Sequence, residues 1–319
     1  MKTTLLALLA AAAFAQQPVI ENGKLETQPF QNSLATQLAQ LGAGPFWAAY
    51  SEPSIPGQHN GCSSKDAVTT IRLEGDTAVV VLIRVEGGKV VQLRIASPDC
   101  KLDAGGLRFI WIDKVPPAAS IAWLKTQVPG EHPDRAITAI ALQSGQAADQ
   151  ALNELTALTE PENVRSKTAF WIGVTRGAQG ITALKRMLAT DPSDKVREQV
   201  VFALSQSKDP QGIPTVIDIA RNDKSTHVRG QALFWLAQKA GNKQAAEVIN
   251  NAAQNDPESQ VKERAVFALQ QMPPDQGIPL LINLAKNNAD PNVRKKAMFW
   301  LGQSKDPRAL DFITQILKQ

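Results

Sequence analysis

A short pattern recurs five times through the second half of the chain at an almost constant spacing. Each occurrence has a valine, a basic residue directly after it, and a phenylalanine five positions beyond the basic residue. The valines are Val164, Val196, Val228, Val261 and Val293, so successive starts lie 32, 32, 33 and 32 residues apart. A fixed period of this length is typical of a repeat array, because a single unit cannot bury its own apolar face. The pattern therefore predicts a linear stack of similar units over residues 161–319.

Each unit reads as two short helices joined by a turn. In the second occurrence, Val196, Val200 and Leu204 fall on one side of a helix. Pro210 would end this helix, and a second apolar stripe begins at Ile213. Helices of about three turns are marginal in water on their own, so their stability must come from the stacking.

The region before the repeats has a different texture, rich in Val, Ile, Thr and aromatic residues. Four segments are predicted as strands: Ala67–Leu73, Thr77–Val85, Val90–Ala96 and Leu107–Ile112. The glycines of Glu86-Gly87-Gly88-Lys89 supply the positive φ that a hairpin turn needs. We therefore predict a small antiparallel β domain over residues 45–115.

The N-terminal end has the features of an export signal. Lys2 precedes an apolar run from Leu5 to Phe14 that is too short to span a bilayer, and Ala13-Phe14-Ala15 fits a cleavage site. We expect residues 1–15 to be a signal peptide and the mature protein to be soluble and periplasmic or secreted. Residues 16–44 are interpreted as a linker with one short helix.

The chain has two cysteines, Cys62 and Cys100. In an oxidising compartment an even pair most simply forms one disulfide, which would tie the β domain. The alternative is a thiol pair or metal site, for which two cysteines and three scattered histidines are a poor ligand set.

The helical part is predicted to occupy residues 116–319. Pro116–Val128 reads as a bridging helix, about 134–160 as an irregular first repeat, and 161–319 as the regular repeats. The fold class is therefore mainly α: an α-solenoid preceded by a small disulfide-tied antiparallel β domain.

Charge is divided unevenly between the two halves. Residues 1–160 carry 12 Lys/Arg and 15 Asp/Glu, whereas residues 161–319 carry 22 and 15, giving net charges of −3 and +7. An exported protein rarely meets nucleic acid, so the basic half favours an acidic protein or an anionic envelope surface, or simply a solvated surface.

The repeats resemble short bacterial HEAT repeats of the phycobilisome-lyase-like kind. The Asp/Asn-Pro turn, the Val-Arg pair and a second helix beginning Gly-Ile-Pro carry this resemblance over 161–319, whereas the β domain resembles no family that we can name. The resemblance implies a superhelical solenoid that acts as a binding scaffold.

Two enzyme families share this repeat, and neither fits these residues. Deoxyhypusine hydroxylase holds iron through His-Glu motifs, but none of His59, His132 and His227 is followed by Glu. Bilin lyases act inside the cell, whereas this chain carries an export signal. Since no catalytic motif or clustered metal-ligand set is present either, we predict no catalytic residue, no metal and no cofactor.

Three sets of repeat positions are candidates for packing or binding. The eighth position of the first helix alternates between Trp171, Ala203, Trp235, Ala268 and Trp300. We interpret the tryptophans as core packing, with an aromatic ladder for a ligand as the alternative. The phenylalanines would either pack sideways on the next first helix or form an exposed row on the convex side.

The basic residues of the pattern are predicted to form a structural ladder with acidic turn residues, since an Arg fork can hold a carboxylate between neighbouring repeats. These residues are Arg165, Arg197, Arg229, Lys262 and Arg294, and the acids are Glu160, Asp191, Asp223, Asp256 and Asp290. A cationic rail for a ligand is the alternative.

The second helices are expected to line the concave surface. Their outward positions are Arg186, Asp218, Asn251, Asn283 and Thr314. This polar row suits an extended peptide or protein surface, so we predict a non-catalytic protein-interaction scaffold of unknown oligomeric state. The alternatives are an enzyme or enzyme accessory with activity in the β domain, and a structural envelope protein.

Overall fold

The computed structural model describes residues 18–56, 78–239 and 243–318, which form two compact units, Met1–Ala151 and Leu152–Gln319. The predicted signal peptide, the strand predicted at Ala67–Leu73, His59 and Cys62 lie outside the described residues. In the described part, no helix is long and apolar enough to cross a membrane.

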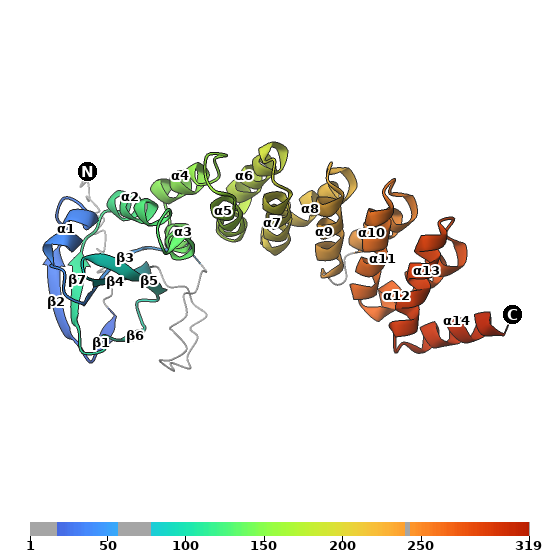
Figure 1. The fold of residues 1–319 in the computed structure, drawn as a ribbon, viewed down its shortest axis with the longest axis horizontal. Helices are drawn as coiled ribbons and strands as arrows, with labels where there is room; N and C mark the ends of the chain where they lie inside the picture. Colours follow the sequence, from blue (N-terminus) through green and yellow to red (C-terminus); the bar gives the residue numbers. More distant parts are fainter. Residues whose placement is uncertain (1–17, 57–77, 240–242, 319) are drawn as a thin grey trace, which may run out of the picture. The chain divides into compact units, whose positions relative to one another are not determined.

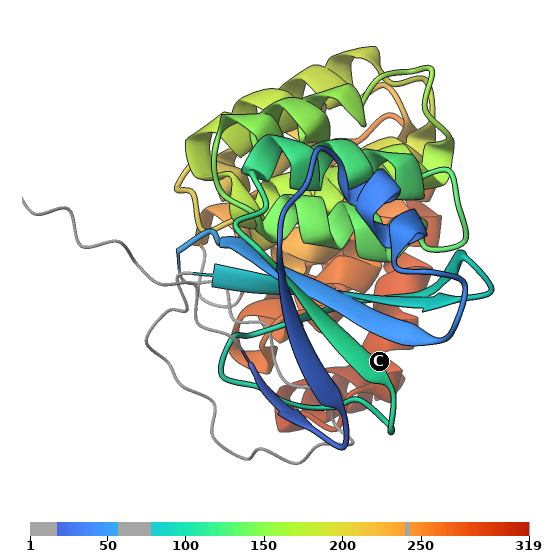
Figure 2. The same ribbon diagram turned by 90° about the vertical axis from the view of Figure 1, so that its left-hand side faces the viewer.

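The first unit is built on a mixed five-stranded sheet with strand order β2-β7-β3-β4-β5. The strands are β2 (Lys24–Pro29), β3 (Phe46–Pro53), β4 (Ala78–Glu86), β5 (Lys89–Ala96) and β7 (Arg108–Asp113). A separate parallel pair joins β1 (Val19–Glu21) to β6 (Lys101–Asp103). Figure 2 shows this unit with the strands in front and helices along one side of the sheet.

The sheet differs from the predicted antiparallel one at β7. The predicted β4–β5 hairpin is present, and β3 and β4 are also antiparallel. However, β7 inserts between β2 and β3 and runs parallel to both. Long connections separate β7 from these strands along the chain, and parallel pairing requires connections of this kind rather than tight turns.

Residues 16–44 are more than a linker with a helix. The expected helix is α1 (Leu34–Gln40), which is capped by Ser33, but β1 and β2 precede it. Strand β2 lies at the edge of the sheet and most of its residues are exposed or half-buried. Because an edge strand of this kind lacks a continuous apolar face, its sequence gives little signal.

Helices α2 (Pro117–Gln127) and α3 (Pro133–Leu142) belong to the first unit, not to the array predicted from residue 116. The hydroxyls of Tyr50 and Ser120 lie 3.0 Å apart, and the Ser120 hydroxyl donates to Gln143 Oε1 at 3.1 Å. This buried network connects β3, α2 and the end of α3. The next helix, α4 (Gln146–Glu154), spans the division between the units.

The second unit consists of five helical hairpins in two layers (Figure 1). The first helices are α5 (Glu162–Thr175), α7 (Asp194–Gln206), α9 (Thr226–Ala237), α11 (Ser259–Gln271) and α13 (Pro291–Gln303). The second helices are α6 (Gly177–Thr190), α8 (Gly212–Asn222), α10 (Lys243–Asn255), α12 (Pro274–Asn287) and α14 (Pro307–Leu317). All five marker valines are buried, with exposed fractions of 3% or less, so the repeat period predicted the core correctly.

The first-helix layer is the more tightly packed of the two layers. Small residues permit this approach: a Cβ placed on Gly173 would lie 2.8 Å from Cβ of Ala203 in the next first helix. The second helices are spaced more widely. The expectation that they line the concave surface stays a prediction.

Candidate interaction surfaces of the repeat unit

In the first four repeats the basic residue reaches the acidic turn of the following repeat. Arg165 binds Asp191 through two parallel bonds, Nε to Oδ2 at 2.7 Å and Nη2 to Oδ1 at 3.1 Å. Its remaining nitrogen donates to the carbonyl of Glu160, at the turn of its own repeat. Arg229 repeats this geometry, with both bonds to Asp256 at 3.1 Å. The fork thus connects two consecutive turns, as the predicted structural ladder requires.

The other basic residues of this ladder form weaker contacts with the following repeat. Arg197 Nη2 contacts Asp223 Oδ1 at 2.9 Å and also Asp194 of its own helix. Lys262 Nζ lies 3.5 Å from Asp290 Oδ2. Arg294, by contrast, forms no ion pair among the described residues.

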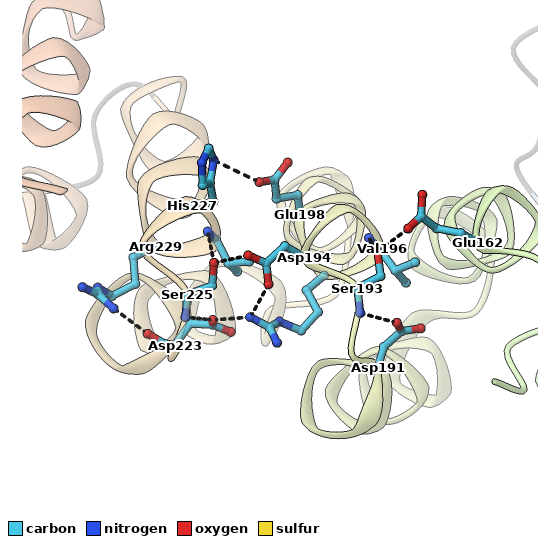
Figure 3. Close-up of polar contacts among 12 residues, drawn as sticks. Glu162, Asp191, Ser193, Asp194, Val196, Glu198, Asp223, Ser225, His227 and Arg229 are labelled. Carbon is cyan, nitrogen blue, oxygen red and sulfur yellow. Dashed lines mark hydrogen bonds and ion pairs between the residues drawn. The ribbon is translucent and has the colours of Figure 1, made fainter. Parts of the chain in front are cut away.

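The acidic turn residues also organise their own turns (Figure 3). Asp223 Oδ1 accepts from the backbone N–H of Ser225 at 2.8 Å, and Ser225 caps helix α9. The Ser225 hydroxyl in turn donates to Asp194 of the preceding first helix. Such side-chain caps satisfy helix N–H groups that have no other partner. The junctions at the starts of α7 and α9 therefore tie a turn, a helix start and the neighbouring repeat together.

Asp191 is almost fully buried, and its charge is stabilised by this arrangement. Burial alone would raise the pKa of its carboxyl. The Arg165 guanidinium and the backbone N–H of Ser193 outweigh burial and hold the pKa below its usual value. The carboxylate is therefore ionised at neutral pH and stabilises the junction between the two repeats. Because Arg165 is bound to it, the guanidinium is not free to bind a ligand as part of a cationic rail.

A continuous row of aromatic rings runs along the first helices. Its members, in contact order, are Trp171, Phe170, Phe202, Trp235, Phe234, Phe267, Trp300 and Phe299. Phe170 stacks on Phe202 with ring centroids 5.7 Å apart and planes 9° apart. The phenylalanines thus pack sideways on the next first helix, which confirms the packing alternative.

The tryptophans take part in the packing between repeats, as we predicted, since Trp235 and Trp300 contact the phenylalanine of the preceding hairpin. Trp171, Trp235 and Trp300 are half-buried, whereas the alanines that alternate with them are fully buried. The indole N–H groups of Trp171 and Trp300 are enclosed without a hydrogen-bond partner among the described residues. Because the ring faces are used in contacts between repeats, the row offers few free faces on which a ligand could stack.

The five predicted binding residues are all exposed on successive second helices. Three of them accept a hydrogen bond from an asparagine one turn later: Asp218 from Asn222, Asn251 from Asn255, and Asn283 from Asn287, at 2.7 to 2.8 Å. Arg186 donates to Asn153 and Thr156 instead, and the Thr314 hydroxyl bonds its own helix. A row of exposed polar pairs therefore follows the second-helix layer.

A hollow of about 210 Å³ lies between α10 and α12 in this row. Its lining includes Gln254, Asn255, Asn283, Asn287 and Asn288. Carboxamide groups both donate and accept hydrogen bonds and carry no charge. Sequence reasoning identified Asn283 but missed the hollow, because a hollow depends on how far apart the second helices lie.

The first unit contains one conspicuous buried acid, Glu52 on strand β3. It is 2% exposed, and neither carboxylate oxygen has a hydrogen-bond partner among the described residues. Burial raises the pKa of this carboxyl to about 8. The sequence analysis did not predict β3 and therefore gave no reason to single out this residue.

The first unit has one small hollow among the described residues. A hollow of about 40 Å³ is lined by Trp47, Arg94 and Asp103 among others, which leaves room for only a few water molecules. No cluster of three or more potential metal ligands occurs in the described part. His227 lies in the array, exposed and 3.7 Å from Glu198.

Residues 148–237 and 246–319, which make up just over half of the chain, match the family profile of HEAT repeats. The chain therefore belongs to the HEAT-repeat family, as its repeat pattern indicated. HEAT repeats serve protein interaction, so a protein-interaction scaffold is the class of function that this membership supports. No curated protein matches the chain.

Three solved structures show a similar arrangement of helices. The complex of CpcE and CpcF of phycocyanin lyase from Nostoc is 21% identical, covers 50% of this chain and 99% of its own, and has a TM-score of 0.36. Human deoxyhypusine hydroxylase with glycerol is 13% identical, covers 62% and 90%, and has a TM-score of 0.30. Escherichia coli YibA is 23% identical, covers 57% and 67%, and has a TM-score of 0.36.

Proposed function

We propose that this protein is a non-catalytic, exported scaffold that binds an extended segment of a partner protein along its second-helix layer. The observation that carries the proposal is the row of exposed polar pairs, with its hollow between α10 and α12. The first-helix layer is occupied by contacts that hold the repeats together, which leaves the second helices as the polar surface free for a partner.

The chemistry of this row matches a peptide main chain. Each asparagine pair presents amide donors and acceptors, the same groups that a peptide bond offers. Close-packed helices lie about 8–10 Å apart, and an extended chain advances about 3.3 Å per residue. Because the second helices are spaced more widely than this, one repeat would meet at least about three residues of an extended partner.

The two functional positions at the N-terminal side of the row differ from the asparagines. Arg186 and Asp218 carry opposite charges in neighbouring repeats. These charges favour one position of the partner along the row. A partner carboxylate beside Arg186 would be attracted, whereas the same carboxylate shifted by one repeat would lie beside Asp218 and be repelled.

A cross-linking experiment tests this surface. The variant Asn251→Ala/Asn283→Ala/Asn287→Ala should lose the partner that the wild type retains from envelope extract, without a change in melting temperature. The matched control is Gln206→Ala/Gln238→Ala/Gln271→Ala, which removes exposed amides from the first helices and should keep the partner. Equal retention by both variants would mean that the second helices are not the binding surface.

Export and the disulfide belong to the same proposal. The sequence of residues 1–15 supports periplasmic or secreted localisation, and Cys100 is fully buried in the sheet's core beside Trp47 and Phe109. A bond from Cys100 to Cys62 would stabilise the first unit by roughly 4 kcal/mol in the chain-entropy model. Peptide mapping without reductant, on protein purified from the periplasm, should recover the two cysteines in one linked fragment; separate fragments would contradict the bond.

A further inference from the structure

The last hairpin that the structure describes presents an open face whose counterpart is covered in the first hairpin. Helices α5 and α13 carry the same four residue types at equivalent positions. In α5 these are Arg165, Phe170, Trp171 and Gly173, and in α13 they are Arg294, Phe299, Trp300 and Gly302. The environment of α5 therefore shows what kind of neighbour suits α13.

In the first hairpin this face is covered by the segment 191–206, through Asp191, Phe202 and Ala203. The carboxylate forms two bonds with the guanidinium of α5, at 2.7 and 3.1 Å. The phenylalanine ring stacks on that of α5, with centroids 5.7 Å apart. The alanine lies directly against the glycine of α5, where no side chain would fit.

In α13 the same three groups lack such neighbours within the described chain. Arg294 bonds only the carbonyls of Asn288 and Ala289, at 2.7 and 2.9 Å. Phe299 is 53% exposed. A Cβ added to Gly302 would have nothing within 4 Å. The recognition groups of a repeat junction are therefore present on one side only.

Helix α14, which packs against α13, also carries exposed apolar side chains. Leu310, Ile316 and Leu317 are 65%, 40% and 81% exposed. Large apolar side chains exposed on one helix favour an interaction site.

The charge around this face favours an acidic occupant. Residues 291–319 contain six Lys/Arg and two Asp/Glu. Two faces of this composition repel each other, which opposes pairing with a second molecule through the same end. A helix that begins with an aspartate brings the carboxylate that Arg294 lacks.

We propose that the open face of α13 and α14 binds an α-helix of a partner protein. The helix would carry an Asp at its start and a Phe followed by a small residue 11 and 12 positions later, as Asp191, Phe202 and Ala203 do. The Asp would pair with Arg294, the ring would stack on Phe299, and the small residue would lie over Gly302. The three contacts of this proposal lie on α13, which is a first helix, so they do not depend on the row of polar pairs on the second helices.

The test uses a fluorescent peptide with the sequence of residues 191–206 as the probe and the full-length protein as the receptor. Fluorescence anisotropy should show saturable binding to the wild type. Gly302→Arg should weaken it by about tenfold or more, because the side chain would occupy the docking position. The space at Gly302 is open, so this substitution leaves the fold undisturbed. Gln303→Arg adds the same side chain one position along and should change binding less than about twofold.

Charge exchange sharpens the test. Arg294→Glu should weaken binding of the peptide with the natural sequence. A peptide with Lys in place of Asp191 should bind to that variant again. Absence of saturable binding to the wild type, or equal binding to wild type and Gly302→Arg, would overturn the proposal. A wild-type dimer that Gly302→Arg converts to monomers in sedimentation velocity would show that a second molecule occupies the face, which would overturn the partner-helix assignment.

Discussion

The two compact units differ in the charge state of their buried acids. In the repeat unit, buried Asp191 is held ionised by the Arg165 fork and by its own turn. In the first unit, Glu52 is buried with no such partner among the described residues, and burial raises its pKa to about 8. An acid therefore stabilises the repeat unit through its charge, whereas the first unit is stable when its acid is neutral. The two units should respond to pH in opposite directions.

The largest effect is expected from Asp191→Asn. This change leaves the Arg165 guanidinium buried without a counter-charge, and breaking a buried pair in this way costs about 3–5 kcal/mol. Denaturant unfolding of the repeat unit measures the loss. The wild type should also lose stability as pH falls below 3.8, the usual value for an aspartate, because its folded-state pKa is lowered. A variant as stable as the wild type at pH 7 would show that the fork contributes nothing.

Glu52 should give the next effect, with the reverse sign. The folded state binds the proton more tightly than the unfolded state, so stability is lost as pH rises from 4.5 to about 8 and is constant above that. We expect a loss of about 2–4 kcal/mol. Glu52→Gln should abolish this dependence. Hydrogen exchange of the β3 and α2 amides across this pH range measures it, and a wild-type profile without a slope would contradict the neutral-acid interpretation.

Trp235→Ala sharpens the comparison on the apolar side of the repeat unit. The ring is half-buried and contacts Phe202 and Phe234, with centroids 4.6 and 5.1 Å away. We expect a loss of about 2 kcal/mol, less than for a fully buried tryptophan. Thermal unfolding measures this, and a loss of less than about 0.5 kcal/mol would mean that the row does not connect the repeats.

The smallest effect is expected from Asp218→Asn, the same chemical change as Asp191→Asn but on the second-helix layer. This side chain is exposed and bonds only Asn222, so stability should change by less than about 0.5 kcal/mol. Side-by-side denaturant curves of the two variants make the comparison direct. A large loss here would mean that the second-helix row is structural, and would remove the basis for a binding surface.

The features that recur at the repeat period could be predicted from the sequence. The features that depend on how closely neighbouring helices pack could not. The spacing of Val164 and its four equivalents identified the core, and the basic residue beside each valine identified the junction ladder. The half-buried state of Trp171 was not predictable, because a helical wheel does not show how closely two first helices approach. Gly173, which permits that approach, carries no visible signal in the sequence alone.

The first unit was less predictable for a physical reason. A hairpin such as β4–β5 can be predicted from residues that are adjacent in the sequence. The position of β7 between β2 and β3 is set by contacts between distant segments. Glu52 became conspicuous only once β3 was seen to lie inside the sheet. Of the binding surface, the exposed asparagines were predictable from helical spacing, and the hollow beside Asn288 was not.

The alternation of tryptophan and alanine gives the array a period of two hairpins. Phe170 and Phe234 each stack on the phenylalanine of an alanine-type hairpin, and Phe202 and Phe267 each meet the tryptophan of the next hairpin. Excising one internal hairpin would create a single junction between two hairpins of the same type, whereas excising two in succession would restore matching rings. An array of this kind can therefore be lengthened or shortened without mismatched rings only by an even number of hairpins. The pair of hairpins is the unit that can be duplicated or deleted.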